Sequence, residues 1–370
     1  MSVSNKDKLS PEVNALIEEF QKIQMQATVE FLKIKENQNI NFLELYNKIM
    51  EANSRWVNSK GKDLTLDALY DLTTHEERDF LSRFLQSIFD YMADIEEKNN
   101  PLPKDIKIEQ VSVEGVPVEW QIVSNAREDK VLLYFHGGGM VIGSPRASRY
   151  FTVALGQATK MRVLSVDYRL APKYPHPAGQ EDCVKVYNWL LSSGIKPKNI
   201  IIGGLSAGGF YTLTTLLRLR DDNIALPLGA LCLSPGVDLR IDEIDDSFFE
   251  NAKTDPILAD SGLLLFCLPA YLDGKDPDDP LISPITADLN GLPPILIQAS
   301  SCEMLYSGCK KLFNKAEAAG VDVTLETWDD VPHGFHVFGL NVLPESKEAI
   351  DHIKNFVEKL FKEEEVLQIQ

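Results

Sequence analysis

The chain has 370 residues, of which 44% are hydrophobic and 25% are charged, a composition typical of a folded globular protein. Its formal net charge of −18 argues against nucleic acid as a partner, because an acidic surface repels the phosphate backbone. No stretch is apolar over the roughly 18 residues that a membrane-spanning helix needs, so we expect no transmembrane segment. Residues 1–8 lack the apolar core of a secretory signal, and we expect a cytoplasmic protein.

The five cysteines are scattered along the chain, without a CxxC pair or a spacing typical of metal ligands. We therefore expect reduced, mostly buried thiols, with no disulfide framework and no structural metal.

The first hundred residues show helical periodicity almost throughout. Ser10 followed by Pro11 is typical of a helix start, and apolar residues then recur at spacings of three and four as far as Leu32. Further helical patterns cover 42–56 and 80–89. Because the proline-containing stretch 99–103 is typical of a boundary, we expect a helical N-terminal extension or cap over residues 1–103.

Short apolar runs alternate with helical patterns after this boundary. Such alternation predicts an α/β fold for residues 104–370, with a mostly parallel central sheet flanked by helices. The expected strands are 131–135, 162–167, 200–203, 230–233, 295–299 and 323–328, and the expected helices are 181–192, 207–220, 304–318 and 346–362.

A G-x-S-x-G pattern over residues 204–208 directly follows one predicted strand and opens a helix. This is the setting of a nucleophile elbow, in which a serine occupies a sharp, strained turn with small neighbours. We predict Ser206 as a nucleophile, with Gly204 and Gly208 as the small residues that the turn requires.

A second glycine-rich motif, His136 followed by Gly137, Gly138 and Gly139, comes after the strand that ends at Phe135. Acyl transfer needs backbone N–H groups directed at the oxygen of the tetrahedral intermediate, and glycines let the main chain approach it closely. We assign the oxyanion hole to the N–H groups of Gly138, Gly139 and Ala207, with His136 and Gly137 as supporting residues.

A serine hydroxyl needs a base, and the base needs an orienting acid. In the chain order typical of this elbow both follow the serine, so we expect the base to be His333, which follows the last predicted strand; His336 and His352 remain alternatives. Glu303 is the one carboxylate in the loop after strand 295–299 and is the expected acid. Asp329 and Asp330 also remain possible.

Together these residues resemble the hormone-sensitive-lipase-type branch of the α/β-hydrolases over about residues 105–360. The resemblance implies a serine esterase for short- to medium-chain acyl esters, without metal or cofactor, and with a helical cap formed partly by the N-terminal segment and by an insertion near 240–280. The motifs that carry it are His136–Gly139 with Gly143-Ser144, Asp167–Pro172, the Ser206 elbow, Ser234-Pro235, Asp238-Leu239, Asp255-Pro256 and His333-Gly334-Phe335.

Four positions depart from the family pattern. Leu205 and Glu303 stand where aspartate is commoner, Met140 replaces a frequent aromatic residue, and Ser148 replaces a frequent histidine. We expect Leu205 to alter the support of the substrate pocket without loss of activity, and Met140 to alter the substrate pocket.

The predicted function is therefore a serine carboxylesterase or lipase-like hydrolase that acts on a small acyl ester. Two alternatives share the same residues: an amide or peptide hydrolase, and a ligand-binding member of the fold that has lost catalysis. The amphipathic N-terminal helices either cover the pocket, which we favour, or contact a lipid surface or a second protein.

Overall fold

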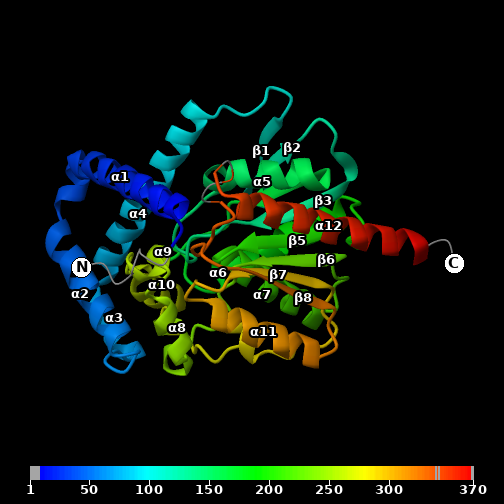
Figure 1. The fold of residues 1–370 in the computed structure, drawn as a ribbon. Helices are drawn as coiled ribbons and strands as arrows, with labels where there is room; N and C mark the ends of the chain where they lie inside the picture. Colours follow the sequence, from blue (N-terminus) through cyan, green and yellow to red (C-terminus); the bar gives the residue numbers. More distant parts are fainter. Residues whose placement is uncertain (1–8, 338–339, 341, 368–370) are drawn as a thin grey trace.

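The computed structural model describes residues 9–337, 340 and 342–367. Within this part of the chain, helices flank both faces of one eight-stranded sheet, and a helical layer lies at one end of it (Figure 1). Strands β1 and β2 form an antiparallel hairpin, β2 is antiparallel to β4, and all later neighbours are parallel, in the order β1-β2-β4-β3-β5-β6-β7-β8. The strands are β1 (Lys107–Val113), β2 (Val116–Ile122), β3 (Arg127–Phe135), β4 (Met161–Val166), β5 (Ile200–Leu205), β6 (Gly229–Leu233), β7 (Ile295–Ser300) and β8 (Val323–Trp328).

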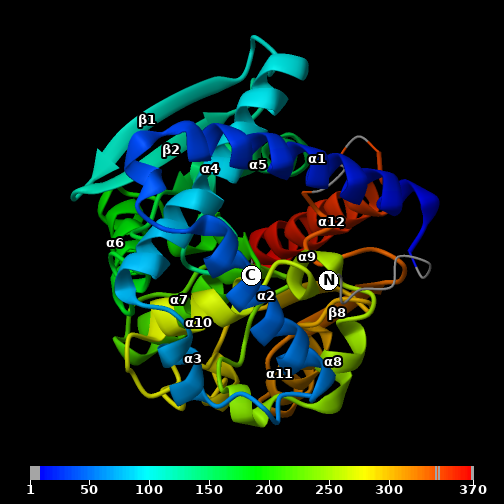
Figure 2. The same cartoon turned by 90° about the vertical axis from the view of Figure 1, so that its left-hand side faces the viewer.

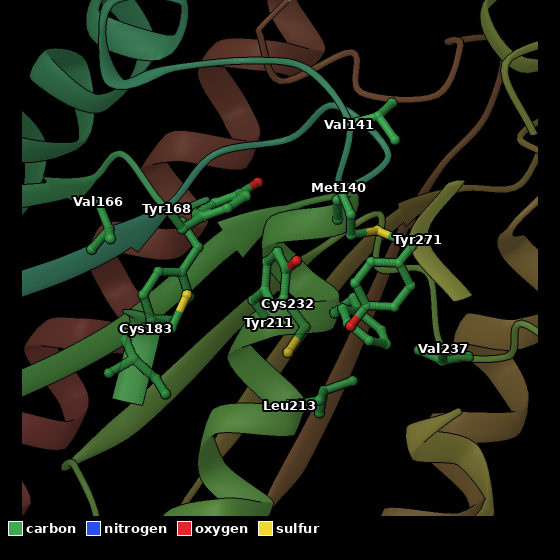
Figure 3. Close-up of a cluster of buried hydrophobic side chains, with 14 of the residues drawn as sticks. Met140, Val141, Val166, Tyr168, Cys183, Tyr211, Leu213, Cys232, Val237 and Tyr271 are labelled. Carbon is green, nitrogen blue, oxygen red and sulfur yellow. The ribbon is translucent and has the colours of Figure 1, made fainter. Parts of the chain in front are cut away.

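Side chains of the central strands alternate between two buried clusters, one on each face of the sheet. On β3, Leu133 and Phe135 enter the larger cluster, while Leu132 and Tyr134 enter the smaller one. Figure 3 shows part of the larger cluster, including Met140 beside the sheet. Helices α6 (Ala178–Ser192), α7 (Ala207–Asp221) and α11 (Tyr306–Ala318) contribute to the larger cluster, and α5 (Pro145–Thr159) and α12 (Pro344–Leu367) to the smaller.

The helical layer combines two parts of the chain that are far apart in sequence (Figure 2). Trp56 and Leu69 from the N-terminal part pack in one apolar cluster with Phe248, Leu258 and Leu265. The layer consists of α1 (Pro11–Lys33), α2 (Phe42–Asn58), α3 (Leu66–Leu72), α4 (His75–Asn99), α8 (Asp246–Asn251), α9 (Pro256–Ala259) and α10 (Leu263–Leu272); short 3₁₀ helices cover Lys35–Gln38, Pro197–Asn199, Ile241–Glu243 and Pro284–Thr286.

The predicted α/β architecture is confirmed, and each predicted strand and helix overlaps an observed one. The β1–β2 hairpin was not predicted: β1 is mostly exposed, so its apolar pattern is weak, and its two-residue turn depends on the positive φ angles of Glu114 (49°) and Gly115 (87°). Helices α3, α5 and α8–α10 were also not predicted. Helix α4 ends at Asn99 and β1 begins at Lys107; the division at residue 103 into a cap and a catalytic domain stays a prediction.

None of the helices in the described residues has both the length and the apolar character that spanning a membrane requires.

A buried ion pair connects the helical layer to the sheet. Arg149 of α5 donates two hydrogen bonds to Glu119 of β2, at 2.8 and 2.7 Å, and a third to Glu97 of α4 at 2.6 Å. The Arg149 side chain is 11% exposed and that of Glu119 is 2% exposed. Because a buried carboxylate without its partner is strongly destabilising, this pair holds α4, α5 and β2 together.

We expect Arg149→Ala to lower the free energy of unfolding by about 3 kcal/mol, because it leaves Glu119 buried and unpaired. Urea unfolding followed by circular dichroism measures the change. In the matched control Arg218→Ala, which breaks the exposed pair with Asp222, we expect a loss of about 0.5 kcal/mol. Equal losses in the two variants would contradict the importance of the buried pair.

Candidate active site

The sharp turn between β5 and α7 places Ser206 in a strained backbone conformation, with φ 56° and ψ −113°. Its amide donates a hydrogen bond of 2.8 Å to the carbonyl of Leu233 in the neighbouring strand. A Cβ atom on Gly204 would lie 2.4 Å from the carbonyl oxygen of Phe135, and one on Gly208 would lie 1.9 Å from it. Both positions therefore require glycine, because the turn packs main chain against main chain at the end of β3.

The structure brings the three residues of the predicted triad together. The Nε2 atom of His333 lies 3.0 Å from the Oγ atom of Ser206, and its Nδ1 atom lies 2.9 Å from the Oε2 atom of Glu303. The His333 side chain is 6% exposed and that of Glu303 is fully buried. With Nδ1 protonated and bonded to Glu303, the Nε2 lone pair faces the serine hydroxyl, as a general base requires.

The carboxylates around His333 favour its protonated form. Burial by itself lowers the pKa of His333, but the hydrogen bond to Glu303 and the charges of Glu303 and Asp255 outweigh it, so the pKa is raised above 6.5. The serine hydroxyl therefore lies against an imidazole of increased basicity.

None of the alternative bases and acids is hydrogen-bonded to Ser206 or His333 in the described residues. The Nδ1 atom of His352 in α12 lies 3.0 Å from the Oε1 atom of Glu326. His336 is fully buried, and burial lowers its pKa to about 3, so it is neutral at pH 7. Asp329 accepts a hydrogen bond from Ser301. Among the described contacts, Ser206 is bonded to His333 and to no other histidine side chain.

The glycine loop, residues 137–143, lies directly beside the nucleophile. A Cβ atom on Gly137 would be 3.6 Å from the Cβ of Ser206. Gly138 and Gly139 have φ angles of 123° and 58°, and the carbonyl of Gly138 accepts bonds of 3.1 Å from the amides of Val141 and Ile142. Ala207, the third predicted oxyanion residue, is buried at the start of α7. The three residues thus lie around Ser206. That their N–H groups act as oxyanion donors stays a prediction.

His136 supports the glycine loop through its side chain. Its Nδ1 atom lies 2.8 Å from the carbonyl oxygen of Gly137, and the hydroxyl of Tyr168 donates a 2.6 Å hydrogen bond to the His136 carbonyl. Burial lowers the pKa of His136 to about 4, so the ring is neutral at pH 7 and donates from Nδ1. His136 therefore holds the glycine loop in place through this hydrogen bond.

Helix α4 also holds the glycine loop, through contacts that the sequence did not indicate. The hydroxyl of Ser82 donates to the carbonyl of Val141 at 3.0 Å, and the amide of Gly143 donates to Oε1 of Gln86 at 2.8 Å. The N-terminal helices are thus bonded directly to the loop beside the nucleophile.

An apolar cavity of about 480 Å³ lies within the helical layer. Leu263 lines this cavity and also lies close to the glycine loop, 3.9 Å from the position of a Cβ on Gly139. Met140 and Leu205 do not line it: both are buried, Met140 in the larger cluster and Leu205 in the smaller, and their assignment to the substrate pocket stays a prediction. The lining side chains come mainly from α1, α2, α4, α9 and α10, and include Phe20, Met25, Tyr46, Ile49, Leu81, Phe84, Ile88, Ile257, Leu263 and Phe266.

Within the residues that the structure describes, no group of three or more His, Cys, Asp or Glu side chains is arranged to hold a metal ion.

We expect Gly139→Ala to lower kcat/KM for ester turnover about 10- to 100-fold, because its new Cβ displaces the loop. The Cβ would lie 2.5 Å from the Sγ atom of Cys267. Adding Cys267→Ala removes that atom and should restore much of the activity. Steady-state kinetics of a p-nitrophenyl ester measures both effects.

The control for backbone strain alone is Gly320→Ala, at a φ of 76° with no neighbour within 4 Å, and we expect it to leave turnover unchanged. Full activity of Gly139→Ala, or no recovery in the double variant, would contradict the tight contact.

Comparisons with known proteins agree with the fold. A family model described as the alpha/beta hydrolase fold matches residues 132–337. The acetyl-hydrolase of Streptomyces hygroscopicus is 40% identical over 65% of this chain and 79% of its own length, and the esterase of Acinetobacter venetianus is 34% identical over 70% and 84%. The crystal structure of an esterase from the bacterial hormone-sensitive lipase family is 38% identical, with a TM-score of 0.70 over 87% of this chain and 99% of that one. A hormone-sensitive lipase from a metagenome library is 33% identical, with a TM-score of 0.67 over 75% and 99%. The chain belongs to the α/β-hydrolase family, within its hormone-sensitive-lipase branch.

Proposed function

We propose that the protein is a serine carboxylesterase that hydrolyses short- to medium-chain acyl esters. The observation that carries this proposal is the hydrogen-bonded series from Ser206 to His333 to Glu303, at 3.0 and 2.9 Å. The relatives support the same reaction class, since they are named acetyl-hydrolase and esterase.

In the proposed acylation step, Oγ of Ser206 attacks the ester carbonyl carbon while Nε2 of His333 takes the hydroxyl proton. The carbonyl oxygen becomes an oxyanion, which accepts hydrogen bonds from the N–H groups of Gly138, Gly139 and Ala207. Glu303 holds the imidazole in the correct tautomer and stabilises the imidazolium. When the tetrahedral intermediate collapses, the C–O bond of the ester breaks and the imidazolium protonates the departing alkoxide oxygen, which leaves as the alcohol.

Deacylation repeats these steps with water. His333 takes a proton from the water, the resulting hydroxide attacks the acyl carbon, and the bond to Oγ of Ser206 breaks as the oxygen regains its proton. The acid leaves, and no metal or cofactor takes part in the proposed sequence.

We further propose that the apolar cavity binds one side of the ester. Its volume of about 480 Å³ is in the range that encloses a small organic ligand. Residues 1–103 and the insertion near 240–280 would then act together as the cap, which is supported by the cavity's lining from both parts.

The proposed partner is a small-molecule acyl ester, and the proposed location is the cytoplasm. All five cysteines are free, which is compatible with a reducing compartment. Contact of the N-terminal helices with a lipid surface stays a second possibility, since Met25 and Leu43 are both 65% exposed.

The direct test uses Ser206→Ala with p-nitrophenyl esters of increasing acyl length. We expect the wild type to prefer short to medium chains, and the variant to lose at least about 10⁴-fold in kcat because the nucleophile is missing. A fluorophosphonate probe, with the adduct mapped by mass spectrometry, should label Ser206.

Matched esters and amides then separate the alternative activities. Equal or better turnover of the amide would favour an amide hydrolase, and no turnover by the folded wild type would favour a ligand-binding protein. Labelling at a residue other than Ser206 would contradict the proposed nucleophile.

The pH dependence should report the raised pKa of His333. The base must be neutral, so kcat/KM should fall on the acid side with a midpoint above 6.5. Glu303→Gln removes a negative charge beside the ring and should move this midpoint to lower pH, with a loss of activity of up to about 10⁴-fold.

The matched control is Glu326→Gln, which alters a second Glu–His pair, with His352, outside the site. We expect it to leave both the midpoint and kcat unchanged. If the acid-side midpoint does not move in Glu303→Gln, the fall of kcat/KM at low pH is not caused by protonation of His333.

A further inference from the structure

The catalytic acid of the proposed site lies on a short loop, which is hydrogen-bonded to the insertion near 240–280. This acid loop, residues 301–305, joins β7 to α11 and carries Glu303. Residues 251–255, which we call the clasp segment, face this loop. They run from the last residue of α8 to the residue before α9.

Three side chains of the clasp segment bind the main chain of the acid loop. The Nδ2 atom of Asn251 donates to the carbonyls of Ser301 and Glu303, at 2.9 and 2.8 Å. The hydroxyl of Thr254 donates to the carbonyl of Cys302 at 2.9 Å. The amide of Met304 donates to Oδ2 of Asp255, also at 2.9 Å. Every residue from 301 to 304 thus has one main-chain group bonded to this segment.

Glu303 needs such support because its own carboxylate has few partners. Its Oε2 atom is bonded to His333, whereas Oε1 is buried without a hydrogen-bond partner in the described part of the chain. The direction of the carboxylate therefore depends on the backbone that carries it, and not on additional bonds to its oxygens.

Asp255 combines this contact with an electrostatic one. It is fully buried, and its second oxygen caps α9 by accepting from the amide of Leu258 at 3.3 Å. Burial raises its pKa to about 6, while the charge of His333 and the bonds from Met304 and Leu258 favour ionisation. A carboxylate is costly to bury, so packing alone does not explain its presence beside the triad.

We propose that Asn251, Thr254 and Asp255 are positioning residues, which fix the acid loop so that Glu303 faces His333, and that Asp255 adds a second negative charge beside the imidazole. This inference rests on the proposed function.

The decisive variant is Asp255→Asn. It preserves size but removes the charge and one acceptor, so we expect kcat to fall about 10- to 100-fold with KM within about twofold. Loss of the anion should also move the acid limb of kcat/KM to lower pH. The other ionisable groups near His333 are Glu303, which the variant retains, and His336, which is neutral at pH 7.

The matched control is Asp245→Asn. Asp245 caps α8 in the same insertion by accepting from the amides of Ser247 and Phe248, but it has no bond to the acid loop. We expect its kcat and pH profile to equal those of the wild type. A purely structural role for Asp255 predicts instead that both variants lose activity only in proportion to folded protein, and this result would overturn the proposal.

A second pair of variants keeps the test valid if Asp255→Asn does not fold. Thr254→Val preserves shape and removes the donor to Cys302, whereas Thr254→Ser retains the donor. We expect kcat to fall several-fold in the valine variant and to be close to wild type in the serine variant; equal kcat values in both would overturn the positioning role. If wild-type turnover persisted in Ser206→Ala, the proposed function would fail instead, which distinguishes the two outcomes.

Discussion

The arrangement of the site depends on close main-chain contact between two loops at the ends of β3 and β5. Gly208 approaches the carbonyl of Phe135 so closely that a Cβ would lie 1.9 Å from it, and a Cβ on Gly137 would lie 3.1 Å from the carbonyl of Leu205. Main chain cannot repack as side chains do, so the positions of Ser206 and the glycine loop are fixed relative to each other before any substrate binds. This pre-organisation is what an oxyanion site requires, because its donors must not reorient during the reaction.

The remaining parts of the site are held differently, by polar side chains from the helical layer. Ser82 and Gln86 of α4 bind the glycine loop, and the clasp segment binds the acid loop. The same layer also lines the apolar cavity. Its two parts therefore line the proposed substrate cavity and at the same time hold the backbone on two sides of the proposed nucleophile. A substitution in these helices that reshapes the proposed substrate cavity would therefore also disturb the loops that they support.

The sequence predicted those features whose signal is local. Most of the six predicted strands between residues 131 and 328 are largely apolar runs, whereas β8 alternates apolar and polar residues, and the elbow and glycine motifs depend on small residues at adjacent positions. Each of these patterns can therefore be recognised in one short window of sequence. The contacts of Gln86 with Gly143 and of Asp255 with Met304 join residues 57 and 49 positions apart, and nothing in either window indicates the other. Helices α8–α10 are short, and α10 is apolar on all sides with Pro269 inside it, so it lacks the periodicity from which a helix is predicted. Tertiary packing decides these elements.

The electrostatics of the site explain why two carboxylates can be buried near one imidazole. Each buried anion loses hydration, and neither Glu303 nor Asp255 has an arginine or lysine among its hydrogen-bond partners in the described residues. Asp255 is compensated by the backbone N–H groups of Met304 and Leu258, and Glu303 by its hydrogen bond to His333. Both carboxylates also interact with the imidazolium, which forms fully when the serine proton is transferred. The interaction is therefore stronger in the transition state than in the resting enzyme, which is the condition for an interaction to raise kcat. A neutral substitute for either carboxylate would weaken its interaction with the imidazolium, and this loss would be larger in the transition state than in the resting enzyme.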